Sequence, residues 1–176
     1  MSSADSSLKS FSNPRAGSGR LPGKAAVALL AGTMLLAGCT PTISVRAGVD
    51  ATEPICAKVV LTLPDEVLGQ KRVKTNSQAT AAWGEPGSAI TFTCGVEPPQ
   101  PTTEDCQSIT AQVFGEEQVF DWITNSTDNG FTFVSYGRSP AMMVQVPASL
   151  DTPQPTAALL DVASAVAKVE ATSACI

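Results

Sequence analysis

The 176-residue chain is acidic, with 16 acidic residues against 11 basic ones, and it contains no histidine. Without histidine, Ser-His-Asp and Cys-His catalytic arrangements and histidine-containing zinc sites are excluded. An acidic surface also repels phosphate backbones, so we expect no nucleic acid among the partners.

The beginning of the chain has the order of an export signal, in which basic residues precede an apolar run over residues 25–36. The basic residues are Lys9, Arg15, Arg20 and Lys24. An apolar run of this length rises only about 18 Å as a helix, short of the roughly 30 Å hydrocarbon core of a membrane. The pattern therefore predicts a signal peptide rather than a spanning helix.

The apolar run ends in Leu36-Ala37-Gly38-Cys39, which resembles a bacterial lipobox. The resemblance implies that residues 1–38 are a lipoprotein signal peptide and that Cys39 is lipidated, with acyl chains such as palmitate holding the protein to membrane lipid. We therefore expect a lipid-anchored protein on the extracytoplasmic face of the cell membrane. The alternative is an uncleaved anchor, or a plain signal followed by a chance cysteine.

The mature chain would be more acidic than the whole. Four of the 11 basic residues and one of the 16 acidic residues lie before Cys39, which leaves seven against 15 and a net charge of −8. We expect residues 39–53 to be the lipidated cysteine and a flexible tether, because small and polar residues bury too little apolar surface to order a chain. Residues 54–176 are long enough for a single folded domain.

Four further cysteines follow the anchor, at positions 56, 94, 106 and 175. An even number in an exported chain predicts two disulfide bonds. Three pairings are possible, and we favour Cys94 with Cys106, which bracket a proline-rich loop, and Cys56 with Cys175, which would tie the ends of the domain together. We expect no metal and no cofactor, because the sequence has no Cys-x-x-Cys pair and no histidine.

The domain reads as helix, strands, helix. Pro54 begins a short predicted helix that Pro64 ends, and residues 65–75 follow as a solvated connection. Alternating apolar residues predict strands over 89–94, 119–124, 131–136 and 142–146, with a weaker fifth over 108–114. Turn sequences at 128–130 and 137–140 predict hairpins, and a second amphipathic helix covers 156–171. We expect an α+β two-layer sandwich, with an antiparallel sheet of about four strands and both helices on one face.

Few residues suggest chemistry. The paired acids Glu104-Asp105 and Glu116-Glu117 could act as acid and base or hold Ca²⁺, but adjacent acids on loops are typical of solvated surface. Three basic residues cluster in the connection after the first helix, and their alternative to simple solvation is an anionic ligand site. These residues are Lys71, Arg72 and Lys74. We expect no catalytic residue.

Four residues are weak candidates for binding, because aromatic residues and arginine contribute most to recognition. They are Asp121, Trp122, Tyr136 and Arg138. The structural alternative is that Trp122, like Trp83, packs in the core and that Arg138 is solvated in a hairpin. Asp121 would then point to the outer face of the sheet or pair with Arg138 across it.

A series of short motifs, in this order, resembles the actinobacterial exported or lipid-anchored proteins of domain-of-unknown-function family thirty-five-fifteen. The motifs are Pro54-x-Cys56, Leu63-Pro64, Ala81-Ala82-Trp83-Gly84-x-Pro86, Thr93-Cys94-Gly95-Val96, Asp121-Trp122 and Tyr136-Gly-Arg138. The resemblance covers the chain from about residue 54 to the end. It implies a compact domain in the cell envelope and supplies no activity.

We therefore expect a non-enzymatic envelope lipoprotein that acts as a binding or accessory module, with a partner protein or small molecule that the sequence does not identify. One alternative is a hydrolase of envelope polymers that uses carboxylates alone, which needs two acids across one cleft. Another is a stabilising subunit of a membrane complex, which needs an exposed apolar patch.

Overall fold

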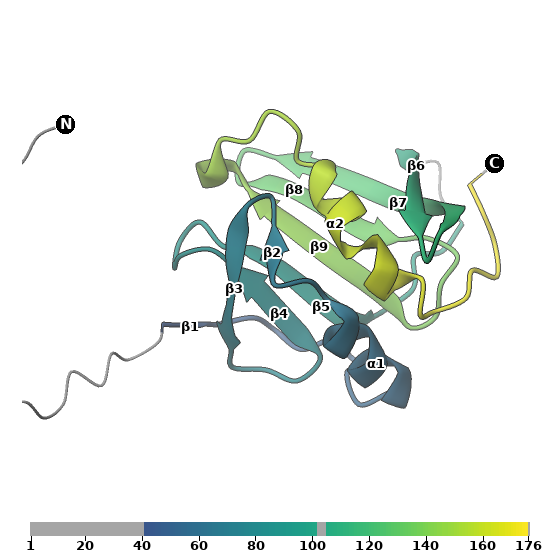
Figure 1. Cartoon of the computed structure of the whole chain (residues 1–176), viewed down its shortest axis with the longest axis horizontal. Helices are drawn as coiled ribbons and strands as arrows, with labels where there is room; N and C mark the ends of the chain where they lie inside the picture. The colour runs from purple at the N-terminus through teal and green to yellow at the C-terminus, as the bar shows by residue number, and fades with distance from the viewer. Residues whose placement is uncertain (1–40, 102–104, 176) are drawn as a thin grey trace, which may run out of the picture. The chain divides into compact units, whose positions relative to one another are not determined.

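The computed structural model describes residues 41–101 and 105–175 (Figure 1). The predicted signal peptide, the lipidation residue Cys39 and Glu104 lie outside the described residues. Neither helix in the described part is long and apolar enough to cross a membrane.

The domain consists of one mixed sheet with two helices packed on one of its faces (Figure 1). Helix α1 covers Pro54–Thr62 and helix α2 covers Ala157–Val166, with a short 3₁₀ helix, η1, at Ala148–Leu150. The strands are β1 (Thr42–Ile43), β2 (Glu66–Val67), β3 (Gln70–Thr75), β4 (Thr80–Trp83), β5 (Ile90–Val96), β6 (Cys106–Val113), β7 (Glu116–Thr127), β8 (Gly130–Ser135) and β9 (Ala141–Pro147).

The spatial order of the strands is β1-β3-β4-β5-β9-β8-β7-β6, with β2 paired to β3. Strand β1 is parallel to β3 and all other pairs are antiparallel. The α+β architecture is confirmed, but the expected four-stranded sheet is wrong: it has nine strands and is mixed. The expected solvated connection over 65–75 forms β2 and β3, because cross-strand pairing holds its charged residues in extended backbone.

The core lies between the helices and what we call the helix face of the sheet. Alternate residues of β4 to β9 point into it, and the largest fully buried side chains include Phe92, Phe133, Met142 and Val144. Both tryptophans, Trp83 and Trp122, also lie here, so core packing accounts for them.

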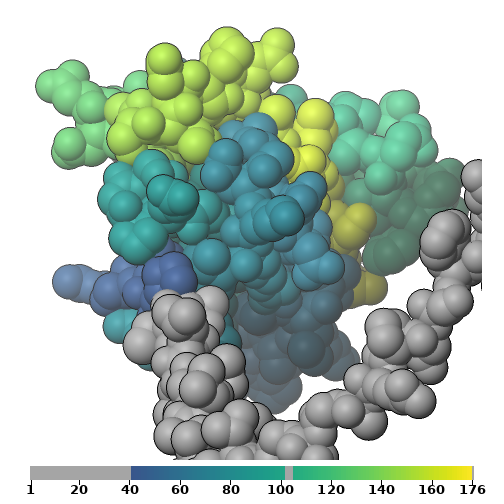
Figure 2. Space-filling view, turned by 60° about the vertical axis from the view of Figure 1, so that its left-hand side comes forward, coloured from purple at the N-terminus to yellow at the C-terminus, as the bar shows by residue number. Residues whose placement is uncertain are grey.

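The opposite, outer face is crossed at one end by the segment before α1. Ile43 and Val45 pack against Ala82, and the N–H of Val45 donates to the side chain of Asn76 at 3.0 Å. The backbone N–H of Asp50 donates to the carbonyl of Gly95 at 2.8 Å. Figure 2 shows this purple-blue segment against the teal strands. Over residues 42–51 the structure thus differs from the expected flexible tether, because two apolar side chains find a place on the sheet.

Two disulfides are present, as expected, but the favoured pairing is wrong. Cys56 bonds to Cys94, with Cα atoms 5.5 Å apart, and Cys106 bonds to Cys175, with Cα atoms 6.2 Å apart. Cys94 is on β5 and Cys106 is on β6, four strand positions away, which corresponds to roughly 19 Å at 4.8 Å per strand. A disulfide requires Cα atoms within about 7 Å, so the short-loop pairing is geometrically excluded.

Candidate functional site

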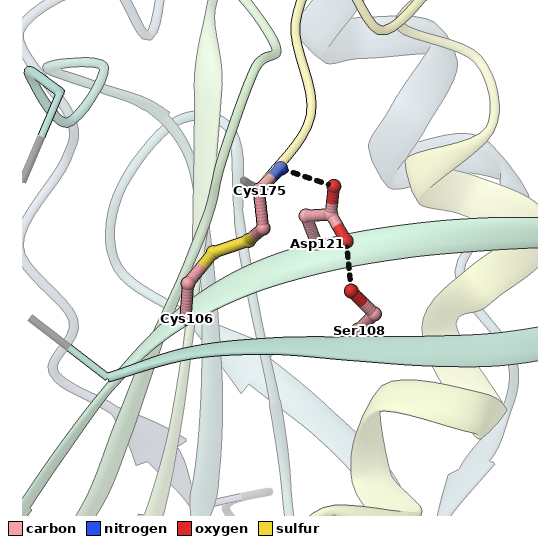
Figure 3. The surroundings of a disulfide bond; sticks show 4 residues. All are labelled: Cys106, Ser108, Asp121 and Cys175. Atoms are coloured by element: carbon pink, nitrogen blue, oxygen red, sulfur yellow. Dashed lines mark hydrogen bonds between the residues drawn. A yellow bond between two sulfur atoms is a disulfide. The ribbon is translucent and has the colours of Figure 1, made fainter.

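Asp121, one of the predicted binding residues, is buried on the outer face of β7. The Ser108 hydroxyl donates to its Oδ1 at 2.6 Å and the backbone N–H of Cys175 donates to its Oδ2 at 2.9 Å. Figure 3 shows both bonds beside the Cys106–Cys175 disulfide. The carboxylate thus joins the edge strand β6 to the C-terminal segment.

Arg138 is also buried, and its Nη1 donates to the carbonyl of Val169, just after α2. Its guanidinium carbon lies 5.0 Å from the centre of the Phe120 ring, within the range of a cation–π contact. Burial lowers the pKa of Arg138 from its usual value and the charge of Asp121 opposes that shift. An arginine stays protonated at any physiological pH, so this is a permanent buried cation.

Tyr136 and the glycine that follows it complete the same arrangement. The backbone N–H of Tyr136 donates to the Asp121 carbonyl at 2.8 Å, and the Gly137 carbonyl accepts the N–H of Thr172 at 2.7 Å. We call the set Asp121, Tyr136, Gly137 and Arg138 the clasp. The structure brings three of the four predicted binding residues together in it, but the polar groups of Asp121, Gly137 and Arg138 hold residues 169–175 of the chain itself.

The two tryptophans differ in one respect. Nε1 of Trp83 donates to the Pro64 carbonyl at 3.0 Å, whereas Nε1 of Trp122 is buried without a hydrogen-bond partner among the described residues. Oγ1 of Thr124, two residues further along the same face of β7, is in the same condition. Trp122 is therefore a packing residue with an unsatisfied polar group.

The acidic pairs do not meet at one site. Asp105 is exposed immediately before β6, while Glu116 and Glu117 are exposed at the start of β7. These positions lie at opposite ends of the eight-residue strand β6, about 24 Å apart at 3.4 Å per residue. Within the described ranges, no group of three or more acidic or cysteine side chains is placed to hold a metal ion.

The three basic residues Lys71, Arg72 and Lys74 have different surroundings. Nη1 of Arg72 donates to the Leu63 carbonyl and Nη2 donates to the Val60 carbonyl, each at 3.1 Å, so Arg72 satisfies carbonyl groups at the end of α1. Lys71 lies opposite Glu66 in the β2–β3 pair, and Lys74 is exposed on β3. Arg72 thus stabilises the end of α1, and Lys71 takes part in the β2–β3 pair.

A feature that the sequence analysis missed lies on the outer face. Four uncharged polar residues stand side by side on four adjacent strands, in register with one another: Thr91, Gln145, Thr132 and Asn125. We call them the polar row. Thr91 donates a hydrogen bond to Oε1 of Gln145 at 3.2 Å, which orients the amide. Their strand neighbours Phe92, Val144 and Phe133 point to the opposite face and form the core.

A groove of about 390 Å³ opens over three members of the polar row, Thr91, Thr132 and Gln145, where β5 begins and β9 ends. Its lining contains no charged residue: Ala89, Thr91, Thr127, Asn129, Gly130, Phe131, Thr132, Gln145, Val146 and Pro147. The sequence contained one indication of this row, namely a polar residue at alternate positions of the four strands that carry it. Only the strand order reveals that these positions align, so the sequence could not indicate a shared surface.

The family profile described as "Protein of unknown function (DUF3515)" matches residues 23–174. The chain belongs to this family. The match covers the described domain up to residue 174 and includes the clasp, the polar row and the Cys56–Cys94 disulfide of this DUF3515 protein, while Cys175 of the second disulfide lies just after its end. Neither the curated proteins nor the solved structures contain a match to the chain.

Proposed function

We propose that this DUF3515 protein is a lipid-anchored, non-enzymatic binding module of the cell envelope, exposed on the outer side of the membrane. The basic leader, the apolar run and the lipobox-like motif support export and lipidation at Cys39. The two disulfides support the same compartment, since disulfides persist in oxidising environments and are rare in the cytosol.

The proposed anchor would hold the domain close to the bilayer. Thr42, the first residue of β1, follows Cys39 by three positions, and three extended residues reach about 10 Å at most. The domain would work within about one protein radius of the membrane, where envelope polymers and membrane proteins are both within reach.

The groove over the polar row carries the binding part of the proposal. Hydroxyl and carboxamide groups both donate and accept hydrogen bonds, and they do so without a charge. Such a lining matches a ligand rich in hydroxyl groups and offers no counter-ion to a phosphate or carboxylate. We infer that the ligand is a neutral polyhydroxyl compound, the class to which envelope polysaccharides belong.

The anchor is tested by the intact mass of the protein from the membrane fraction of its native host, with and without reduction. The expected mass is that of residues 39–176 plus a diacylglyceryl group, with a gain of four hydrogens on reduction of the two disulfides. An unlipidated chain, or one that carries free thiols, would overturn the localisation.

The groove is tested by cosedimentation of the protein with purified, protein-free polysaccharide from the envelope of the same host. Thr132→Ala with Gln145→Ala removes two side chains of the polar row, and we expect at least about tenfold weaker binding. Gln154→Ala with Thr156→Ala is the matched control, because it removes the same two side-chain types near the start of α2. Equal binding by both variants would refute the groove as the site, and absence of binding by the unmodified protein would refute the ligand class.

A further inference from the structure

The two edges of the sheet are built differently. At one edge, β3 is flanked by β1 and β2, which have two residues each, and Lys71 and Lys74 lie on β3 itself. Short edge strands and lysines are the usual means by which proteins prevent another strand from pairing. This edge is therefore protected.

The other edge is β6, which runs for eight residues from Cys106 to Val113. Within residues 41–101 and 105–175, the one strand that pairs with β6 is β7. Its sequence, Cys-Gln-Ser-Ile-Thr-Ala-Gln-Val, contains no charge and no proline, and Thr110 and Gln112 are exposed. This edge has none of the protective features of the first.

The neighbourhood of β6 adds apolar surface. Phe114, directly after the strand, is 69% exposed, and Val119, which follows on β7, is 57% exposed. The amine of Lys168 lies 4.3 Å from the centre of the Phe114 ring and covers part of it. These two apolar side chains lie beside β6, where they add contact area for a chain that pairs with it.

The edge is also held in place before any partner arrives. The Cys106–Cys175 disulfide fixes its first residue, and Ile109 and Ala111 pack against the core. Since these residues are ordered already, a strand that pairs with β6 loses little conformational freedom on this side.

We propose that β6 pairs antiparallel with β6 of a second copy of this chain and extends the sheet across a two-fold axis. Self-pairing suits this strand in particular. The mature chain has 15 acidic residues, so most of its surface repels a second copy, but β6 brings no charge to the contact. In an antiparallel two-fold contact the residues near the axis meet their own counterparts and those at one end of the strand meet the other end of the second copy, so a strand that is uncharged throughout is self-complementary.

The test is sedimentation velocity of the full chain in detergent over about a hundredfold range of concentration. One strand pair with Phe114 and Val119 is smaller than a standard interface, so we expect a reversible dimer with a Kd in the micromolar range or above. Thr110→Lys with Gln112→Lys places like charges across the axis, and we expect the Kd to rise by at least about tenfold. Ser126→Lys is the control, since it adds a lysine to an exposed position of the interior strand β7 outside the residues that pair with β6, and it should leave the Kd unchanged.

Each result decides the matter. Association through the apolar leader would be common to all variants, so a dimer that persists with the two lysines overturns the proposal. A chain that stays monomeric at every concentration tested also overturns the proposal, and the partner of β6 would then be a strand of a different protein. If the double variant does not fold, amide exchange on the unmodified chain replaces it: exchange of the β6 amides must slow as concentration rises, while that of β3 must not.

Discussion

The two disulfides stabilise different parts of the domain, and they do so by different means. Cys56–Cys94 joins α1 to β5, and both residues are fully buried in the core. Cys106–Cys175 joins the edge strand to the C-terminal segment, with Cys106 exposed and Cys175 half-buried. The first bond is packed inside the core, whereas the second lies at the surface beside the clasp. A comparison of the two therefore separates the contribution of burial to stability from that of loop length.

Removal of the buried bond should have the largest effect. The bond spans 38 residues, and its loss restores about 4 kcal/mol of chain entropy to the unfolded state. Two alanines in place of Cys56 and Cys94 also leave space in a close-packed core. We expect the double variant to lose about 4 to 5 kcal/mol in the free energy of unfolding, measured by urea denaturation. A loss below about 2 kcal/mol would contradict the chain-entropy contribution itself, because a core that closes over the gap removes only the packing cost.

Removal of the exposed bond should cost less, although loop length alone predicts more. It spans 69 residues, which gives a slightly larger entropy term than the buried bond. However, residues 171–174 are exposed, so without the bond they can detach while the rest stays folded. We expect Cys106→Ser with Cys175→Ser to lose about 2 to 3 kcal/mol. Thiol labelling during mild reduction should modify these two residues before Cys56 and Cys94, and the reverse order would contradict the comparison.

The sequence predicted the elements that can be recognised locally. Both helices were found, and so were the strands with regular alternation, because turn residues such as Asn129-Gly130 mark their ends. Strands β1 to β4 were missed because their residues do not alternate: β4 is Thr-Ala-Ala-Trp and is buried at every position. The disulfide pairing depends on strand order, which no local pattern encodes.

The candidate site was predicted in part, for a related reason. Asp121, Tyr136 and Arg138 were singled out and do come together, but Asp121 and Arg138 bind backbone groups of residues 169–175, which carry no recognisable motif. Their role as a clasp therefore could not be read from side-chain types. The polar row was missed because its members come from four strands that are adjacent only in the folded sheet.

The clasp itself can be tested at Gly137, where the backbone φ is +70° and an added Cβ would collide with the backbone of Ser173. Gly115 is the matched control, because its φ is +88° but an added Cβ meets nothing within 4 Å. Gly115→Ala should cost about 1 kcal/mol for the left-handed backbone alone. We expect Gly137→Ala to cost about 2 kcal/mol and to speed amide exchange at Thr172 and Cys175. Equal costs would mean that the C-terminal segment moves aside freely.

The smallest effect that we expect is the difference between Trp83 on β4 and Trp122 on β7. Trp83→Phe removes the hydrogen bond from Nε1 to the Pro64 carbonyl and leaves that carbonyl without its partner. Trp122→Phe removes an N–H that is buried and unsatisfied, which offsets part of the packing that is lost. Both changes delete the same atoms from fully buried sites, so cavity terms largely cancel in the comparison. We expect Trp83→Phe to lower the free energy of unfolding by about 1 kcal/mol more than Trp122→Phe in urea denaturation. A larger cost at Trp122 would contradict this expectation. It would mean that the N–H of Trp122 has a hydrogen-bond partner in solution, such as a buried water molecule.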